Sequence, residues 1–448
     1  MNNVSAIIAE YASAANQKSL PTCVTHDFKR ALLDYMSCII SGSKEPIVSA
    51  LASCLDSDKK SSSPSFDIYN NAFINGVRAH AIDFDDGYTQ GSCHPGAVIF
   101  PAVFSIAKKY NSSTDEIIKA VVLGYDVMLR IAATVHPTSA KYGFHNTSIA
   151  GIFGAAAAAA SIIGLDSKKM RNALGLAASF SGGILEFLEE GADSKRLHAG
   201  KAARDGVLCA EMAARGISGP NHFLEGNFGF FNAFTRNEIR SNFIIDSIGQ
   251  KFLISDVYFK LYPCCRHYHA AIDAALDLKS EVNFQINEIK SIEIGLYEIA
   301  VKGHDQKIIK NLLEAQMSAP CAISLALLDN EVSNTSFSTS SLDRLDFQRT
   351  IEKTTTVIDP LCESIYPSVR SGVVTLTLTN GTQLQKRIDN PKGESSNPLS
   401  DTDLEKKFIN NSKSIISNDK ISEILEKIWN FDNKDPQEIL KINNTLFI

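Results

Sequence analysis

A glycine- and alanine-rich segment constrains the fold of this chain more than any other stretch. It begins near Thr147, contains Gly151, Gly154 and six consecutive alanines at 155–160, and ends at Gly164. Alanine is the best helix former, and a glycine after such a run favours the left-handed residue that commonly terminates a helix. Because only small side chains cover much of this predicted helix, neighbouring backbones can pack closely against it. We therefore expect it at the centre of a helical bundle.

Apolar residues recur at helical spacing through the first half of the chain, with Gly-, Pro- or Ser-rich breaks between the segments. One such break is the serine-rich stretch 59–65. Asp166 is placed to be the N-cap of a helix over 168–178, and a later helix is expected to end at Gly216. The first half therefore predicts a large all-helical domain. Its other helices are predicted over 4–15, 26–41, 46–55, 69–82, 97–110 and 114–134.

The pattern changes kind after about residue 250, where apolar and polar residues begin to alternate. The alternation over 292–297 is typical of a half-buried strand. A second alternating run covers 374–379, and Asn380-Gly381 then predicts a two-residue hairpin turn before a strand over 384–388. The second part of the chain therefore predicts an α+β domain.

These patterns predict a mainly α fold with two domains. The large all-helical domain covers 1–254, and a smaller α+β domain covers 255–398. Helices near 267–279 and 311–329 are expected to cover one face of the sheet. The tail, 399–448, returns to a helical pattern and is expected to pack back on the helical domain.

Composition and charge argue against several classes of function. The chain has 448 residues and a formal net charge of −6, whereas nucleic acids and anionic membranes attract basic proteins. Its nine cysteines include no C-x-x-C pair, which is typical of a reducing compartment such as the cytoplasm and lacks the thiolate spacing of many metal sites. We expect no metal site, no signal peptide and no membrane-spanning segment, because the N-terminus lacks a basic region before an apolar core and no apolar stretch reaches about 18 residues.

The segment 81–96 concentrates acid/base side chains, since Asp83, Asp85, Asp86 and His94 lie within twelve residues of one another. It follows a predicted helix, and the Pro-Gly pair after His94 disfavours helix. Crowded carboxylates repel, which tends to raise one pKa and leave a base near neutrality. The alternative is a solvated acidic turn that caps the next helix. We predict that Asp83, on the helix end and facing the bundle, is the acid/base carboxylate, and that the other two cap the helix or orient His94.

A basic cluster lies at the predicted start of the helix that ends at Gly216. Cations at a helix N-terminus oppose the helix dipole, at a cost of roughly a few tenths of a kcal/mol each. Such a cluster favours a bound anion, because backbone N–H groups and side chains then point positive charge at one place. The alternative is a solvated basic face that pairs with acidic residues just upstream. The cluster consists of Lys195, Arg196, His198, Lys201 and Arg204.

A third cluster opens the second domain, in the segment 260–269. Pro263 favours an extended turn before the following helix, which would present Lys260, Cys265 and Arg266 from a loop. One motif of this kind is weak evidence for a site. Three clusters of charged and imidazole side chains in separate segments are stronger evidence, because a binding site between domains would bring them together.

Short motifs in one order along nearly the whole chain resemble the MmgE/PrpD family. That family includes 2-methylcitrate dehydratase, cis-aconitate decarboxylase and iminodisuccinate epimerase. Each motif is modest by itself, but their shared order makes the resemblance specific. The motifs are Ala81-Ile-Asp-Phe-Asp-Asp86 followed by His94-Pro-Gly96, Gly143-Phe-His-Asn-Thr147, Lys195-Arg-Leu-His-Ala-Gly-Lys-Ala-Ala203, Tyr262-Pro-Cys-Cys-Arg266 and Asn397-Pro-Leu-Ser400.

The resemblance implies a large all-helical domain with a smaller α+β lid domain, a homodimer, and a cofactor-free site between the domains for a small di- or tricarboxylate. From the residues alone, His145 would be an ordinary buried histidine at a helix start, and its place in the family motif is what makes it a candidate. Residues that match family active-site positions are Asp83, His94, His145 and Lys195. The predicted substrate-binding residues are Lys260, which matches the basic residue that opens the lid motif, with Cys265, Arg266 and His198.

The chemistry of the family agrees with the side chains of the clusters. All three family reactions develop negative charge next to a carboxylate, which requires a positioned acid or base and cations to hold that charge. We therefore predict a lyase that transfers a proton at the carbon next to a carboxylate, with a 2-methylcitrate dehydratase-type hydro-lyase as the first choice. Departures from the decarboxylase pattern disfavour decarboxylation: Gly87, Cys265 and Cys321 stand where the similar decarboxylase has threonine, histidine and tyrosine.

Two other family reactions and one non-enzymatic role are the alternatives. A cysteine after the proline resembles the epimerase, and Cys265 could donate or accept a proton because the nearby Arg266 and Lys260 would lower a thiol pKa. Plain packing is the other interpretation of Cys265, and Cys264 is an equal candidate for the chemical role. A non-catalytic carboxylate-binding protein would need only the cations, so the acid/base residues beside them favour an enzyme.

Overall fold

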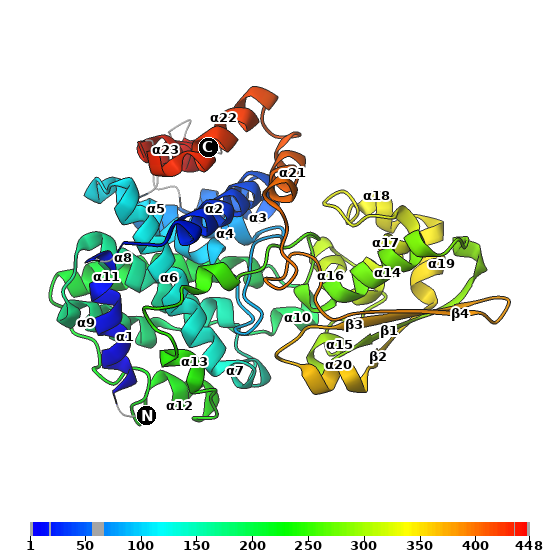
Figure 1. The fold of residues 1–448 in the computed structure, drawn as a ribbon, viewed down its shortest axis with the longest axis horizontal. Helices are drawn as coiled ribbons and strands as arrows, with labels where there is room; N and C mark the ends of the chain where they lie inside the picture. Colours follow the sequence, from blue (N-terminus) through cyan, green and yellow to red (C-terminus); the bar gives the residue numbers. More distant parts are fainter. Residues whose placement is uncertain (1–2, 18, 56–66, 434, 446–448) are drawn as a thin grey trace. The chain divides into compact units, whose positions relative to one another are not determined.

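The computed structural model describes residues 3–17, 19–55, 67–433 and 435–445. The serine-rich break at 59–65 therefore lies outside the described residues. The chain divides into two compact units, which are coloured along the sequence in Figure 1. We call them the helical unit, which comprises Met1–Leu185, Ser194–Val257 and Ser400–Ile448, and the mixed unit, which comprises Glu186–Asp193 and Tyr258–Leu399.

The fold class predicted from the sequence is confirmed: the protein is mainly α, with a smaller α+β part. The helical unit contains α1 (Val4–Ala14), η1 (Ala15–Gln17), α2 (Thr22–Gly42), α3 (Pro46–Leu55), α4 (Ile68–His80), α5 (Gly96–Tyr110), α6 (Thr114–Val135), α7 (Thr138–Lys141), α8 (Asn146–Ile163), α9 (Ser167–Phe180), α11 (Ser194–Ala214), α12 (Phe230–Thr235), α13 (Asn242–Ile245), η2 (Leu253–Asp256), α21 (Asp401–Ser412), α22 (Asn418–Trp429), η5 (Phe431–Asn433) and α23 (Gln437–Thr445).

The glycine- and alanine-rich helix α8 lies at the centre of the helical unit, as its small side chains predict. It contacts α5, α6, α9 and α11, and every residue from Asn146 to Ser161 is buried. A Cβ added at Gly154 would stand 2.5 Å from the carbonyl oxygen of Gly124 in α6, so these two backbones touch. The helix stops at Gly164, whose φ of 76° is the predicted left-handed conformation.

Of the described helices, α8 is the one that is long and apolar enough to cross a membrane by length and composition. In the structure 89% of it is buried inside the protein. This burial is what its position in the core of the helical unit requires, because the surrounding helices cover it on several sides.

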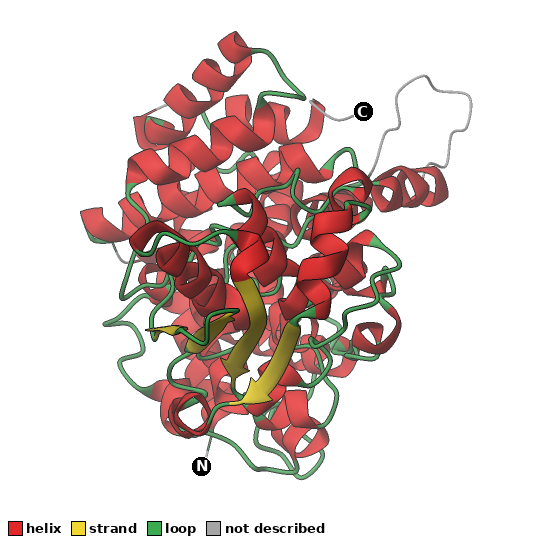
Figure 2. Ribbon diagram, turned by 90° about the vertical axis from the view of Figure 1, so that its right-hand side faces the viewer, coloured by secondary structure: helices red, strands yellow, loops and turns green. Residues whose placement is uncertain are grey.

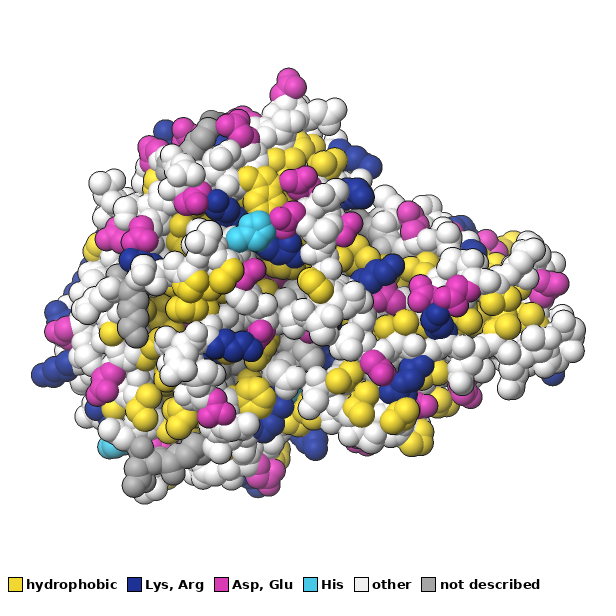
Figure 3. All heavy atoms as spheres, in the orientation of Figure 1, with side chains coloured by type: hydrophobic (Ala, Val, Ile, Leu, Met, Phe, Trp, Pro, Cys, Tyr) yellow, Lys and Arg dark blue, Asp and Glu magenta, His cyan; other side chains and the backbone are white. Residues whose placement is uncertain are grey.

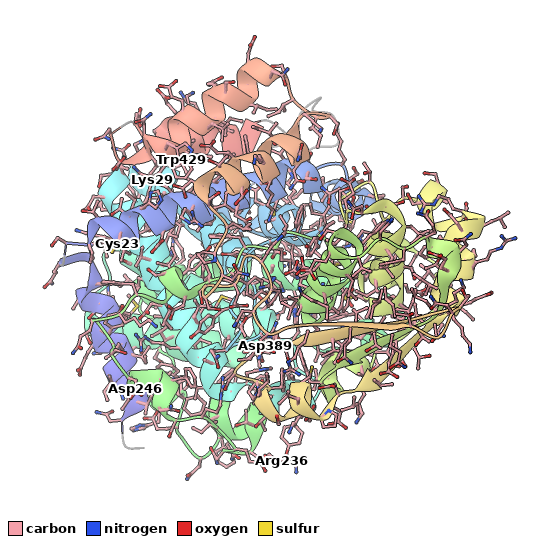
Figure 4. The ribbon with its side chains drawn as sticks, turned by 45° about the vertical axis from the view of Figure 1, so that its right-hand side comes forward. Cys23, Lys29, Arg236, Asp246, Asp389 and Trp429 are labelled. Carbon is pink, nitrogen blue, oxygen red and sulfur yellow. The ribbon has the colours of Figure 1, made fainter. Side chains whose placement is uncertain are left out.

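The C-terminal helices complete the helical unit. Helices α21 and α22 both contact α2. The ammonium of Lys29 in α2 donates a hydrogen bond to the carbonyl oxygen of Trp429 at 2.8 Å, and Figure 4 labels both residues. Near the end of the chain, the hydroxyl of Tyr35 donates to Asn443 Oδ1 at 2.6 Å. The tail is therefore packed against the first long helix of the chain.

The mixed unit is built around one four-stranded sheet, drawn in yellow in Figure 2. The strand order is β2-β1-β3-β4, with β1 parallel to β2 and the other pairs antiparallel. Its elements are α10 (Phe187–Glu190), η3 (Arg266–Tyr268), α14 (His269–Glu281), η4 (Ile286–Glu288), β1 (Ile289–Leu296), α15 (Glu298–Val301), α16 (Leu312–Gln316), α17 (Ala319–Asp329), α18 (Thr339–Leu342), α19 (Leu345–Glu352), β2 (Thr354–Ile358), α20 (Pro360–Ile365), β3 (Gly372–Leu378) and β4 (Gln383–Ile388).

The three predicted strands of the mixed unit are present, and a fourth was missed. The alternation in β1 places Ile292 and Ile294 in the core and leaves Glu293 exposed. The predicted turn at Asn380-Gly381 joins β3 to β4, although the connection is four residues long rather than two. The missed strand is β2, whose three consecutive threonines carry little apolar contrast between its faces.

Helices α14 and α17 pack on the sheet, but the predicted helix over 311–329 is two helices. Helix α14 contacts β1, β3 and β4, and α17 contacts α14 and β2. The hydroxyl of Ser318 accepts a hydrogen bond from the backbone N–H of Cys321 and so caps α17, and Pro320 stands in its first turn. A proline interrupts the hydrogen bonding of a continuous helix, which is why α16 ends before α17 begins.

The segment Glu186–Asp193 departs from the predicted domain boundary. The sequence pattern placed it in the helical domain, whereas the structure groups it with the mixed unit. Within that unit Gly191 lies against the side chains of Asn311 and Glu314. These contacts join residues far apart in the sequence. The periodicity of apolar residues therefore could not show that this segment belongs to the mixed unit.

Acidic and basic side chains are interspersed on the face of the protein shown in Figure 3. No continuous basic stripe crosses the described residues on that face. This arrangement agrees with the net charge of −6, since nucleic-acid binders concentrate Lys and Arg on one surface.

The crossing of α4 and α11 yields a prediction about stability. A Cβ at Gly76 would stand 2.5 Å from the Cα of Gly200 and 2.8 Å from its nitrogen. We expect Gly76→Ala to force the two helices apart and to lower the free energy of unfolding by about 1–3 kcal/mol, measured by thermal or urea denaturation. Gly182→Ala is the control, because a Cβ there meets nothing within 4 Å. Equal melting temperatures for the two variants would contradict this close approach.

Candidate active site

The helical unit joins two of the predicted clusters through one buried ion pair. The ammonium of Lys195, in the first turn of α11, lies 2.7 Å from Asp83 Oδ1, in the loop that follows α4. Both side chains are buried. The two residues meet because α4 and α11 pack through Gly76 and Gly200. A buried pair of this kind holds a carboxylate and an ammonium in fixed positions away from bulk water.

The backbone around Asp83 differs from the predicted helix end. Helix α4 stops at His80, and Asp83 has a φ of 53°, in the left-handed region. The apolar pattern of Ala81 and Ile82 extended the predicted helix too far, because both residues are buried without being helical. Asp83 therefore reaches Lys195 from a turn and not from a helix face.

The other two carboxylates of the segment bind groups of the protein. Asp85 Oδ2 lies 2.8 Å from His80 Nδ1. Asp86 accepts hydrogen bonds from the backbone N–H of Gly96 at 2.8 Å and from the hydroxyl of Tyr125 at 2.7 Å. Because Gly96 is the first residue of α5, Asp86 satisfies the start of that helix, as the sequence predicted for this carboxylate or its neighbour.

The pKa of Asp86, in the same segment as Asp83, is raised well above its usual value. Burial is the first cause of the raised pKa of Asp86, and the nearby charge of Asp34 is the second. Asp83 instead faces the ammonium of Lys195. The neighbouring carboxylates thus contribute to the raised pKa of Asp86, and the raised pKa that we expect for Asp83 stays a prediction.

In both predicted catalytic histidines, His94 and His145, a ring nitrogen lies within hydrogen-bond distance of a named partner. His94 Nδ1 lies 2.7 Å from the backbone carbonyl oxygen of Asp86, so Nδ1 donates and Nε2 is left as the basic nitrogen. His145 Nδ1 lies 2.9 Å from His198 Nδ1. Such a contact requires one ring to donate and the other to accept, so both rings cannot be protonated at once without repulsion.

The electrostatics favour neutral imidazoles at the paired histidines. Burial, then His198 and His80, hold the pKa of His145 well below its usual value. Burial, then His80 and Lys201, lower the pKa of His198 to about 4. Both rings are therefore neutral near pH 7, and a neutral imidazole is the form that accepts a proton. The role of His198 in substrate binding stays a prediction.

His80 is a member of this group that the sequence argument did not single out. Its ring centroid lies 5.1 Å from that of His94 and 6.1 Å from that of His145. Within α4 it stands in the last turn, where a histidine is an ordinary helix-end residue. Its contact with Asp85, five residues later, depends on the turn between them, which the sequence pattern did not reveal.

A metal ion could be considered for part of this group. Among the described residues, His80, Asp85 and His94 have ligand atoms within 4.8 Å of one another. The Nδ1 atoms of both histidines already have oxygen partners, at 2.8 Å and 2.7 Å. A metal bound at the Nε2 atoms could leave these hydrogen bonds in place, so the metal-independent site stays a prediction.

The mixed unit presents the third cluster near the start of α14. Lys260 and Arg266 are buried. The Arg266 guanidinium lies 3.1 Å from Glu394 Oε2, 3.0 Å from His269 Nδ1, and 4.4 Å from the centroid of the Tyr258 ring. A guanidinium held by a carboxylate, an imidazole and a ring is rigid. The predicted substrate-binding roles of Lys260 and Arg266 remain predictions.

The two adjacent cysteines have different surroundings. Cys264 is buried, with its sulfur 3.7 Å from His269 Nε2. Cys265 is partly exposed, and its sulfur lies 3.4 Å from Nε2 of His304, a residue that sequence reasoning missed. His304 Nδ1 donates to the carbonyl oxygen of Lys302 at 3.1 Å, which leaves Nε2 to accept from the thiol. This geometry favours Cys265 over Cys264 for proton transfer.

Cys321 lies in a position without an evident chemical role. It is buried in the core of the mixed unit, and burial raises the pKa of its thiol well above the usual value. A thiol with a raised pKa is protonated and a poor base. Packing is therefore the interpretation that the structure supports for this cysteine.

Comparisons with known proteins agree with the motifs. The family model of the MmgE/PrpD N-terminal domain matches residues 6–241, and the model of the MmgE/PrpD C-terminal domain matches residues 262–431. Human cis-aconitate decarboxylase is 27% identical over 386 residues, which cover 82% of this chain and 78% of that protein. Cis-aconitate decarboxylase of Aspergillus terreus is 22% identical, over 99% of this chain and 96% of its own length. The cis-aconitate decarboxylase-like protein oryM of Aspergillus oryzae is 24% identical, over 98% and 97%.

The different partners of the carboxylates predict different effects of substitution. Asp83→Asn keeps the side-chain volume and an oxygen for Lys195 but removes the titrating group, so we expect turnover to fall by about 10² or more. Asp86→Asn disturbs the start of α5 and the bond to Tyr125, so we expect a stability loss of about 1–3 kcal/mol with much of the turnover of the folded enzyme retained. Steady-state kinetics and melting temperature measure both. An active Asp83→Asn with an inactive Asp86→Asn would show that the acid/base role belongs to the other carboxylate.

Proposed function

Because the chain belongs to the MmgE/PrpD family, we propose that it is a lyase that acts on a small di- or tricarboxylate by proton transfer at the carbon next to a carboxylate. The observation that supports this proposal most is the buried pair of Asp83 and Lys195 beside His94 and His145. A carboxylate base, an ammonium and neutral imidazoles are the groups that such a proton transfer requires.

Each group has a part in the proposed reaction. Asp83 or a neutral imidazole removes a proton from the carbon next to the carboxylate. The electron pair left behind spreads onto that carboxylate, where the ammonium of Lys195 stabilises the added negative charge. His94, whose Nδ1 is held by the carbonyl of Asp86, is oriented to exchange protons through Nε2. Burial strengthens these interactions because little water screens them.

Dehydration of the 2-methylcitrate type is the reaction that we place first. It removes a proton from one carbon and a hydroxyl group from the neighbouring carbon, so an alkene and water form. The first step needs a base, and the lowered pKa of His145 keeps this imidazole in its basic form. An iminodisuccinate-type epimerisation would use the same base but would return a proton to the opposite face of the carbon.

Decarboxylation of cis-aconitate is the second candidate, because the relatives reported above carry that name. In this reaction a C–C bond breaks, CO₂ leaves, and the remaining carbanion must receive a proton. The step needs an acid, and the side chain of Lys195, 2.7 Å from Asp83, is placed to supply the proton. The departures of Gly87, Cys265 and Cys321 from the decarboxylase pattern are the feature that places this reaction second.

A substrate screen tests the proposal. Purified protein is incubated in D₂O with 2-methylcitrate, citrate, cis-aconitate and iminodisuccinate, and each mixture is followed by NMR. We expect alkene formation from a hydroxy acid, with deuterium entering the carbon next to a carboxylate. Loss of CO₂ from cis-aconitate would instead establish the second candidate.

Two further results would count against the proposal. Saturable binding of these acids with no proton exchange and no product would indicate a carboxylate-binding protein. Activity that disappears on exhaustive chelation and returns with added iron or zinc would contradict the proposed metal-independent proton transfer.

The role of Lys195 predicts a large kinetic effect of its removal. Lys195→Ala should lower kcat/KM by on the order of 10² or more, the range typical for the loss of one group that stabilises charge in the transition state. Lys201→Ala is the matched control on the same helix, because Lys201 is half-exposed and lies 3.1 Å from Asp205. We expect the control to change kcat/KM by less than about twofold. Similar losses in the two variants would mean that α11 presents a general basic surface and no specific group.

A further inference from the structure

A lysine from the C-terminal tail reaches the loop that carries Asp83. Lys407, in α21, is buried, and its ammonium lies 2.7 Å from the carbonyl oxygen of Phe84 and 2.6 Å from Asp34 Oδ1 in α2. The same ammonium lies 4.0 Å from the centroid of the Phe84 ring. A hydrogen bond from a charged donor to a buried carbonyl oxygen is strong, because water does not compete for either the donor or the acceptor.

Asp34 holds the next part of the same loop. It accepts a hydrogen bond from the backbone of Asp86, in addition to its contact with Lys407. The buried pair Asp34 and Lys407 therefore grips the loop at two points, the carbonyl of Phe84 and the backbone of Asp86. Asp83 precedes the first point directly, and Asp85 lies between the two.

These contacts hold a loop in which the backbone at Asp83 is strained. Asp83 has a φ of 53°, and a residue other than glycine persists in this strained region only when its surroundings hold it there. The carbonyl direction of Phe84 sets the orientation of the peptide group between Phe84 and Asp85. Fixing that peptide restricts ψ of Phe84 and φ of Asp85, and so limits how far the neighbouring residues Asp83 and Asp85 can shift.

We propose that Lys407 and Asp34 are positioning residues that hold the Asp83–Asp86 loop in the geometry in which Asp83 faces Lys195 and Asp86 orients His94. The inference rests on the proposed function, since it assigns these residues to the same reaction. Neither residue touches the reacting atoms, so both act through the loop. The tail of the chain thereby becomes part of the catalytic apparatus of the helical unit.

A charge-free double variant separates positioning from stability. Removal of one member of a buried pair strands the other charge, whereas apolar replacement of both is often neutral or stabilising. We therefore combine Lys407→Met with Asp34→Leu. The expected result is a folded protein whose kcat is at least about tenfold lower, because the donor to Phe84 is gone, and whose KM changes less than about threefold, because Lys195 is untouched.

Two single variants give the rescue and the control. Lys407→Gln keeps an N–H donor for Phe84 without the charge, so its kcat should exceed that of Lys407→Met. Asn411→Ala removes a bond of 2.8 Å to Ser37 across the same pair of helices, α21 and α2, and leaves Lys407 and Asp34 in place. It should leave kcat within about twofold of the wild type, which shows that loss of packing between these helices is not the cause.

Hydrogen exchange provides a measurement that does not depend on turnover. Amides of the peptide that covers 83–93 should exchange faster in the double variant than in the wild type and in Asn411→Ala. A wild type that converts none of the tested acids would defeat the proposed function, while the exchange rates would still report on the grip. A folded double variant with wild-type kcat, or with unchanged exchange in this peptide, would overturn the inference.

Discussion

The helical unit depends on direct contact between helix backbones at positions occupied by glycine and alanine. Gly76 of α4 meets Gly200 of α11, and Gly206 of α11 meets the backbone of Ala156 in α8. Helices that touch in this way cannot slide without collision, because there is no flexible side chain between them to give way. The first turn of α11 and the loop after α4 are therefore held at a fixed separation, and the Asp83–Lys195 pair follows from it.

The same dense packing determines the charge state of the site. Burial is the first cause of the shifted pKa values of His145, His198, Asp34 and Asp86. It keeps the two histidines neutral and makes the two carboxyls harder to ionise. A di- or tricarboxylate that enters such surroundings brings negative charge to the neutral imidazoles. If the proposed substrate binds there, its charge would raise the proton affinity of the imidazoles, and they would hold a proton more firmly.

Local features of the sequence predicted the parts of the structure that depend on local rules. The central helix, its end at Gly164 and the cap at Asp166 all follow from residue size, left-handed φ and capping, and all are confirmed. Features that depend on distant partners were missed. His304 lies in a turn, away from the other histidines in the sequence. Lys407 is one of two adjacent lysines in a helix. Nothing beside either residue marks it, because the atoms that give it a role come from elsewhere in the chain. The predicted end of α4 was too late, because the buried apolar residues Ala81 and Ile82 continue the helical pattern into the turn.

The order of the three stretches that make up the helical unit matters when the protein is synthesised. The ribosome produces Asp34 early, but the partner of this buried carboxylate follows 373 residues later. At about 5–20 residues per second, that gap corresponds to roughly 20–75 s of translation. In the later part of this interval, once His198 has been made, the nascent chain contains the proposed acid/base residues of the helical unit, but Lys407 has not yet been made. A product released before α21 would carry the proposed reacting groups without the lysine that we propose holds their loop.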